Sequence, residues 1–192
     1  MTYAPLDPAA AVLLFADLQE GIVERSTTVE EARLRRAVGM LARLAQLFSI
    51  PVVVTAAPSP TGGPEIVPEI GQGLGGEVRP LVRNTTDAFT HAPTREAIER
   101  TGRRTLLVSG VATEVIVQHS CLSAVERGYA VQLVVDACGG ISPRTEDAAL
   151  RRLVSAGVVP TSLASLAGQL AGDFTQPRGA QALGIVFQMA GG

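Results

Sequence analysis

The residues best placed to do chemistry in this sequence lie where a predicted strand gives way to a predicted helix. Leu106–Ser109 is an apolar run of strand type, Gly110 interrupts it, and Thr113 is a suitable N-cap for a helix that continues to Gly128. Position 116 then falls in the first turn of that helix, where free N–H groups and partial positive charge favour an anion and depress the pKa of a thiol. A cysteine there would suit covalent catalysis, but the residue is Ile116, which can neither attack a substrate nor carry a proton.

Three further side chains are candidates for the missing role. Cys138 lies at the carboxyl edge of the next predicted strand, so it is either a relocated nucleophile or a structural or interface residue. Cys121 lies five residues beyond Ile116, which turns it about 140° away on a helix, so we expect it in the core. His119 follows Ile116 by three residues and is predicted to share its helix face, as a polar interior or interface residue or as a catalytic one. His91 lies in a predicted loop and is assigned no role.

A carboxylate ends the first predicted strand. Val12–Ala16 is a continuous apolar run, typical of a strand buried on both faces of a parallel sheet, and Asp17 follows it directly. An unpaired buried charge is costly, so this carboxylate needs a partner. The strand pattern by itself favours a structural aspartate that caps a neighbouring loop, with proton transfer as the alternative.

Strands and helices alternate along the chain. The predicted strands are 12–16, 51–55, 78–82, 106–109, 131–135 and 158–161, and the predicted helices are 29–48, 93–102, 113–128, 142–157 and 162–171. This alternation predicts a single doubly wound, Rossmann-like α/β domain over residues 1–192, with a mostly parallel six-stranded sheet and helices on both faces. Ligands of such sheets bind beyond the carboxyl ends of the strands, the edge where Asp17, Arg83, 110–116 and 136–139 would lie.

Two segments fall outside this alternation. Residues 56–76 are rich in glycine and proline, and we interpret them as a lid over the site or as a solvated excursion. Residues 176–192 form an apolar C-terminal tail that needs a surface to cover, either its own domain or a neighbouring subunit.

Composition excludes several classes of function. The chain is 46% hydrophobic with a formal charge of −2, which indicates a globular protein in water. The arginines are dispersed and aromatic residues make up only 4%, so no nucleic-acid partner is expected. No apolar run approaches the roughly 20 residues that span a bilayer, and the N-terminus lacks the pattern of a signal peptide, so no membrane partner is expected. Two cysteines do not make a disulfide framework, and a cytoplasmic location is the default.

Four segments resemble a known family. Gly110-Val-Ala-Thr-Glu-Val-Ile116 resembles the nucleophile segment of the isochorismatase-like hydrolases, the cysteine hydrolase superfamily, and in particular its YcaC-like branch. Ala11–Ile22 resembles the family's first strand, with the acidic residue at Asp17, and Leu81–Phe89 resembles the segment that supplies the basic residue, here Arg83. Gly128–Ala137 resembles the strand that follows the nucleophile, so the resemblance extends over residues 8–170.

The resemblance implies roles for these residues. Asp17 would transfer protons, and Arg83 would pair with it or bind an anionic substrate group, because an arginine holds its proton and cannot be the general base. The family's loop at Val111, Ala112 and Thr113 carries a cis peptide between the first two, and amides near residues 112–116 would face the pocket. The nucleophile position is Ile116, although true isochorismatases also lack the cysteine.

Two functions follow as hypotheses, with a third beside them. The first is hydrolysis of a small anionic metabolite through Asp17 without a cysteine nucleophile, as in vinyl-ether hydrolysis by isochorismatases. The second is a catalytically inactive relative that serves as an oligomeric scaffold or small-molecule binder. The third is amide hydrolysis with Cys138 as the nucleophile. No cofactor or metal is expected, since the sequence has Thr55-Ala-Ala-Pro where the nicotinamidase branch carries histidine ligands. The family likeness favours a homo-oligomer in which the 176–192 tail contacts a neighbouring subunit.

Overall fold

A six-stranded parallel sheet forms the frame of the protein. The computed structural model describes residues 5–59 and 64–188. All strand pairs are parallel, in the order β3-β2-β1-β4-β5-β6. The strands are β1 (Ala11–Ala16), β2 (Val52–Ala56), β3 (Leu81–Val82), β4 (Thr105–Val111), β5 (Ala130–Gly139) and β6 (Val159–Thr161). The predicted fold class is confirmed.

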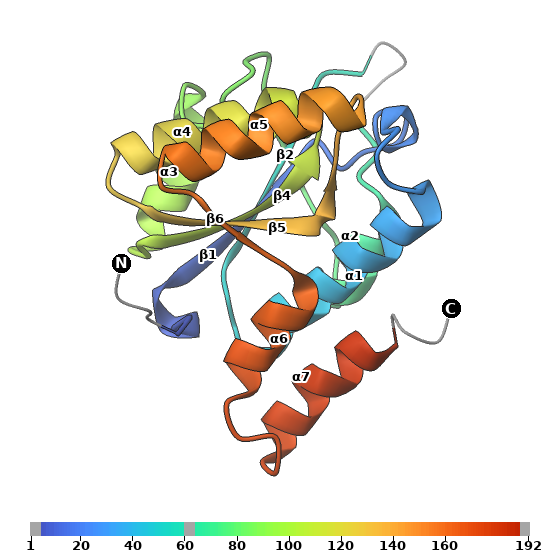
Figure 1. Cartoon of the computed structure of the whole chain (residues 1–192), viewed down its shortest axis with the longest axis vertical. Helices are drawn as coiled ribbons and strands as arrows, with labels where there is room; N and C mark the ends of the chain where they lie inside the picture. Colours follow the sequence, from blue (N-terminus) through green and yellow to red (C-terminus); the bar gives the residue numbers. More distant parts are fainter. Residues whose placement is uncertain (1–4, 60–63, 189–192) are drawn as a thin grey trace.

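Helices cover both faces of the sheet (Figure 1). One layer holds α1 (Glu31–Leu47), α2 (Pro68–Leu74), α6 (Leu163–Ala171) and α7 (Pro177–Phe187), and the other holds α3 (Ala92–Arg100), α4 (Gln118–Glu126) and α5 (Pro143–Ser155). Short 3₁₀ turns occupy Pro8–Ala10 and Val23–Arg25. Because strand side chains alternate, Leu13 and Phe15 pack into the core under the first layer, and Val12 and Leu14 into the core under the second.

Several boundaries differ from the predicted ones. β4 runs through Gly110 to Val111, so the prediction that this glycine interrupts the strand is wrong. The segment 56–76 contains α2, and because its residues 60–63 lie outside the described residues, its role as a lid stays a prediction. β3 is limited to Leu81–Val82, since Pro80 before it has no N–H to donate to a sheet. β5 runs on to Gly139 instead of ending at Val135, so that Cys138 is a strand residue.

The strand order reverses between β1 and β4. β2 and β3 lie beside β1, whereas β5 and β6 lie beyond β4. This topological switch point is where open α/β sheets bind their ligands. The two strands approach each other closely there, because a Cβ built on Gly110 would lie 2.4 Å from the carbonyl oxygen of Ala16. Glycine is therefore required at this position, the penultimate residue of β4.

The apolar tail packs on its own domain. α7 lies against α6 and α1 and buries Ala182 and Ile185 in the same core cluster (Figure 1). The buried face of the tail thus covers its own domain, while Phe187 remains 71% exposed at the end of the helix. Residues 189–192 lie outside the described residues. Within residues 5–59 and 64–188, no helix combines the length and apolar character needed to cross a membrane.

Candidate active site

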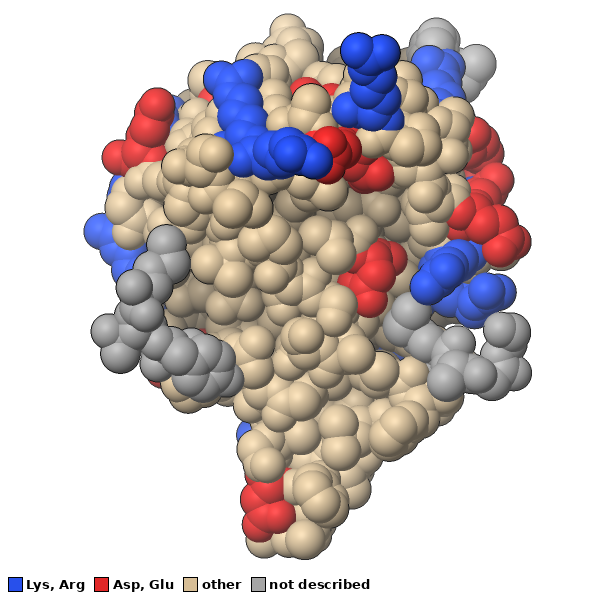
Figure 2. Space-filling view, in the orientation of Figure 1, with Lys and Arg blue, Asp and Glu red and all other residues tan. Residues whose placement is uncertain are grey.

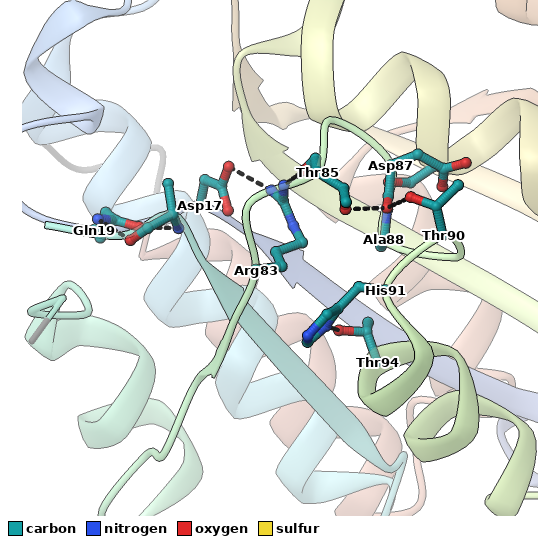
Figure 3. Close-up of polar contacts among 11 residues, drawn as sticks. Asp17, Gln19, Arg83, Thr85, Asp87, Ala88, Thr90, His91 and Thr94 are labelled. Carbon is teal, nitrogen blue, oxygen red and sulfur yellow. Dashed lines mark hydrogen bonds and ion pairs between the residues drawn. The ribbon is translucent and has the colours of Figure 1, made fainter.

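A buried ion pair joins two loops at the carboxyl edge of the sheet. Asp17 follows β1 with φ 56°, and its N–H donates to the Thr55 carbonyl oxygen at 3.1 Å. Arg83 follows β3, where its N–H donates to the Ala56 carbonyl oxygen at 3.0 Å. Arg83 Nη2 donates to Asp17 Oδ2 at 2.5 Å, and Figure 3 shows the guanidinium directed at the carboxylate. Tertiary structure thus brings together two residues that are 66 positions apart in sequence.

Burial dominates the electrostatics of this pair. Asp17 is 7% exposed and Arg83 4% exposed. Burial raises the pKa of the Asp17 carboxyl above its ordinary value, and the charge and hydrogen bond of Arg83 offset part of that rise. Among the described residues, the buried atoms Asp17 Oδ1, Arg83 Nε and Thr55 Oγ1 have no hydrogen-bond partner. Unpaired buried polar atoms are costly, so a hydrogen-bond partner for any of these three would stabilise the site.

The loop after β4 begins differently from the predicted helix. The Val111–Ala112 peptide is cis. Residues 113–117 then form a π-helical turn that leads into α4, and Ala112 occupies the N-cap position without a side-chain capping bond. The prediction that Thr113 caps this helix is wrong, because its hydroxyl donates instead to Glu146 Oε1 at 2.7 Å. The N–H of Val115 donates to the Ala112 carbonyl oxygen at 3.1 Å, so this amide is not free to face a pocket.

The structure separates Ile116 from His119. Ile116 is 2% exposed and packs in the core cluster on the α3, α4 and α5 face of the sheet. His119 is exposed, so the prediction that it shares the face of Ile116 in the interior is wrong. The physical reason is the π-helical turn, which closes on i→i+5 bonds and changes the angular offset expected for an α-helix.

Both cysteines are free thiols inside the protein. Burial raises the pKa of Cys138 to about 12, and burial also raises the pKa of Cys121 far above the range of a reactive thiol. The thiolate is the nucleophilic form, and a thiol of this pKa remains protonated at neutral pH. The hypothesis that Cys138 is a relocated nucleophile therefore has no support in its surroundings.

Sequence reasoning missed the acidic residue beside the loop, Glu114. Its carboxylate accepts the Ile141 N–H at 2.9 and 3.2 Å and the Thr145 hydroxyl at 2.6 Å, at the start of α5. Ile141 precedes Ser142, the N-cap of α5, so this carboxylate ties the segment before α5 to the turn that follows β4. No spacing in the sequence links Glu114 to Ile141, so only the fold reveals the contact.

Gln19 was missed for the same reason. Its side-chain amide accepts the Ala57 N–H at 2.8 Å and donates to the Ala57 carbonyl oxygen at 3.2 Å. These two bonds tie the loop after β1, which carries Asp17, to the end of β2. Figure 3 shows Gln19 beside Asp17 in this arrangement.

A pocket of about 220 Å³ lies beside β5, with Arg33, Thr113, Asp136, Cys138 and Glu146 in its lining. Its acidic groups are engaged in structural bonds. The Asp136 carboxylate accepts the Leu163 N–H at 2.9 and 3.2 Å and so caps α6. In the part of the chain that the structure describes, no three His, Cys, Asp or Glu side chains are grouped to hold a metal ion.

Comparisons with known proteins identify the family and agree with the fold. The family model described as Isochorismatase domain matches residues 11–165. The probable hydrolase YcaC of Escherichia coli is 30% identical over 155 residues, which cover 81% of this chain and 74% of that protein. Isochorismatase domain-containing protein 2 of Bos taurus is 33% identical over 175 residues, 89% of this chain and 80% of that protein.

Solved structures are similar over almost the whole chain. The Escherichia coli YcaC structure, described as an octameric hydrolase of unknown specificity, superposes with a TM-score of 0.89 at 28% identity and covers 98% of this chain and 92% of its own. YcaC from Pseudomonas aeruginosa, solved with hexane-2,5-diol and covalent acrylamide, gives a TM-score of 0.88 at 28% identity over 99% and 96% of the two chains.

The environment of Cys138 gives a direct prediction. Incubation of the native protein with iodoacetamide at pH 7 should leave both cysteines unmodified, because burial keeps the thiols protonated and inaccessible. Mass spectrometry of tryptic peptides checks this, with labelling in denaturant as the positive control. Rapid labelling of Cys138 in the folded protein would restore it as a candidate nucleophile.

Proposed function

The chain belongs to the isochorismatase family, and on this premise we propose that it is a hydrolase of a small anionic metabolite that acts without a cysteine nucleophile. The observation that carries the proposal is the buried ion pair of Asp17 and Arg83, with unpaired polar atoms beside it, at the carboxyl ends of β1 and β3. The family supports the reaction class, and the ion pair supports the chemistry.

Asp17 is the group that transfers the proton in this proposal. Burial raises the pKa of its carboxyl, so the acid form is populated at a higher pH than in a solvated aspartate. Such a group can give a proton to a substrate and take one back from water. Oδ1 is the atom available for this contact, because it has no partner among the described residues.

Arg83 holds the substrate and does not react with it. Its guanidinium stays charged at all working pH values, so it cannot act as a base. When Asp17 takes up a proton, the positive charge of Arg83 is no longer neutralised and attracts a carboxylate. The buried Nε–H, which lacks a partner within the described chain, is the donor for that group. These features support an anionic substrate.

The reaction that suits this pair is hydrolysis of a vinyl ether on a small cyclic acid. Asp17 would protonate the terminal vinyl carbon, and water would add to the resulting oxocarbenium carbon and return a proton to the carboxylate. The hemiketal would then collapse, with transfer of its hydroxyl proton to the leaving oxygen, to a ketone and an alcohol. No bond to the protein forms, so an aliphatic side chain at position 116 is compatible with the mechanism.

The alternative function is a catalytically inactive binder or scaffold, and Ile116 is the observation that favours it. Because Ile116 cannot attack a substrate, the loop after β4 would only bind a ligand in this alternative. Turnover of a substrate distinguishes the two functions, because the hydrolase requires it and the inactive binder or scaffold shows none.

We also propose that the protein self-associates in the cytoplasm. Phe174 and Phe187, which are 65% and 71% exposed, flank α7 and offer an apolar surface to a second copy. A relative in the same branch is described as octameric. The two free thiols are compatible with a reducing compartment.

Replacement of Asp17 tests the proposed hydrolase. Asp17→Asn should lower turnover of a responsive vinyl ether by about 100-fold or more, because the amide cannot exchange the proton, while substrate binding persists. Steady-state kinetics on a panel of vinyl ethers, amides and small acids measures this, with Asp147→Asn, at an exposed ion pair on α5, as the matched control. Thermal unfolding verifies that the variant is folded. Turnover by Asp17→Asn at the wild-type rate would refute the mechanism.

Replacement of Ile116 tests the loop independently of any substrate. The thiol of Ile116→Cys should titrate above its ordinary pKa of about 8.5, because position 116 is buried in the same apolar cluster as Cys121 and Cys138. The pH dependence of acrylamide alkylation measures this, with His119→Cys, an exposed position on the same helix, as the control. If wild type shows no turnover on the panel and Ile116→Cys acquires it, the inactive-relative reading replaces the hydrolase.

Light scattering tests self-association. The wild-type protein should elute as an oligomer, and Phe187→Ser should shift it towards smaller species because an exposed apolar contact is lost. Val154→Ser removes a 51% exposed valine from α5 and should leave the assembly unchanged. A wild-type protein that is monomeric at micromolar concentration would contradict the proposal.

A further inference from the structure

A short segment between β3 and α3 carries Arg83 and is organised around the backbone carbonyl and the carboxylate of Asp87. We call residues 83–90 the Arg83 strap. The Asp87 carbonyl oxygen accepts the Thr85 and Thr90 hydroxyls, each at 2.8 Å, and Asp87 Oδ1 accepts the Phe89 N–H at 2.8 Å. Figure 3 shows Thr85 and Thr90 converging on the Asp87 carbonyl, beside the guanidinium of Arg83. The strap is therefore folded around Asp87.

The strap is also fastened to α4. Asp87 Oδ2 accepts the Ser123 hydroxyl at 2.5 Å, and Ser120 Oγ accepts the Ala88 N–H at 2.9 Å. Ser120 and Ala88 are buried, and a hydrogen bond to an ionised carboxylate is stronger than one between neutral groups. Since α4 continues directly from the turn that contains Ile116, one helix locates both that turn and the strap.

The strap in turn fixes the direction of the guanidinium. Arg83 Nη1 donates to the Thr85 carbonyl oxygen, and Nη2 donates to Asp17. An arginine side chain has many rotamers, so two acceptors on different sides are what define its orientation. The first acceptor, the Thr85 carbonyl oxygen, is held in place because the Thr85 hydroxyl donates to the Asp87 carbonyl oxygen.

We propose that Asp87 is a positioning residue that holds the Arg83 guanidinium against Asp17 by anchoring the strap to α4. The inference rests on the proposed function for its catalytic meaning, but the contact it describes exists without substrate. Asp87 does not reach the reacting atoms in this account. It acts through Thr85 on Arg83, and through Arg83 on the carboxyl that transfers the proton.

The pKa of Asp17 is the readout, because Arg83 is the group that lowers it. If the strap loosens, Arg83 stabilises the carboxylate less, and the Asp17 pKa should rise, by about one pH unit for partial loss of a charge contact. Direct electrostatics predicts the opposite sign, since removal of the Asp87 charge alone would lower the pKa of another carboxyl. The direction of the change therefore separates positioning from simple loss of charge.

The experiment is a titration of ¹³C-labelled aspartate carboxyls by NMR in the full chain without substrate. Asp87→Ala and the milder, uncharged change Ser123→Ala should both raise the Asp17 pKa. Thr90→Val is the matched control. It removes a hydroxyl bond to the same Asp87 carbonyl oxygen, but Thr90, unlike Thr85, makes no contact that orients Arg83. It should leave the Asp17 pKa unchanged.

Two outcomes would overturn the inference. One is an unchanged or lowered Asp17 pKa in folded Ser123→Ala and Asp87→Ala; if Asp87→Ala does not fold, Ser123→Ala alone decides. The other is an equal rise in Thr90→Val. If Asp17→Asn retains activity while Asp87→Ala raises the pKa, the proposed hydrolase fails and the positioning role stands.

Discussion

The constraint on which this site depends is the burial of a carboxylate and a guanidinium in contact with each other. Two charges removed from water lose their solvation energy, and their mutual attraction compensates for only part of that loss. The rest of the fold must therefore hold both side chains in a favourable geometry. The fold does this from three directions. The backbone of β2 positions both residues, Gln19 holds the loop after β1, and the Arg83 strap holds the guanidinium. Three buried polar atoms of this arrangement, on Asp17, Thr55 and Arg83, have no hydrogen-bond partner among the described residues.

The end of β4 and the turn after it form the wall of the site on the other side of β1 from Arg83. Gly110 permits close contact with β1, and the turn that follows faces the same edge of the sheet as Asp17. An aliphatic residue at position 116 makes this wall part of the core, and the proposed function assigns proton transfer to the ion pair. The proposed hydrolysis by direct addition of water needs no covalent bond to this wall of the site.

Most other carboxylates near the edge serve as hydrogen-bond anchors. Glu114 and Asp136 satisfy N–H groups at the starts of α5 and α6, and Asp87 fastens its strap to α4. Each bond joins segments that are distant in sequence. A loop-rich edge can hold a defined shape only if its backbone groups find partners, and short acidic side chains provide them.

The sequence by itself determined the alternation of strands and helices, the class of sheet, the position of the glycine at the switch point and the absence of a nucleophile at residue 116. These features depend on local hydrophobic periodicity and on residue type, both of which can be read directly from the sequence. Tertiary structure decided that Asp17 meets Arg83, that Thr113 serves Glu146 and not its own helix, that His119 faces outward after a π-helical turn, and that β5 extends past Val135. Each of these rests on contacts between residues far apart in the chain or on a local helix geometry that packing imposes, and no spacing in the sequence encodes them.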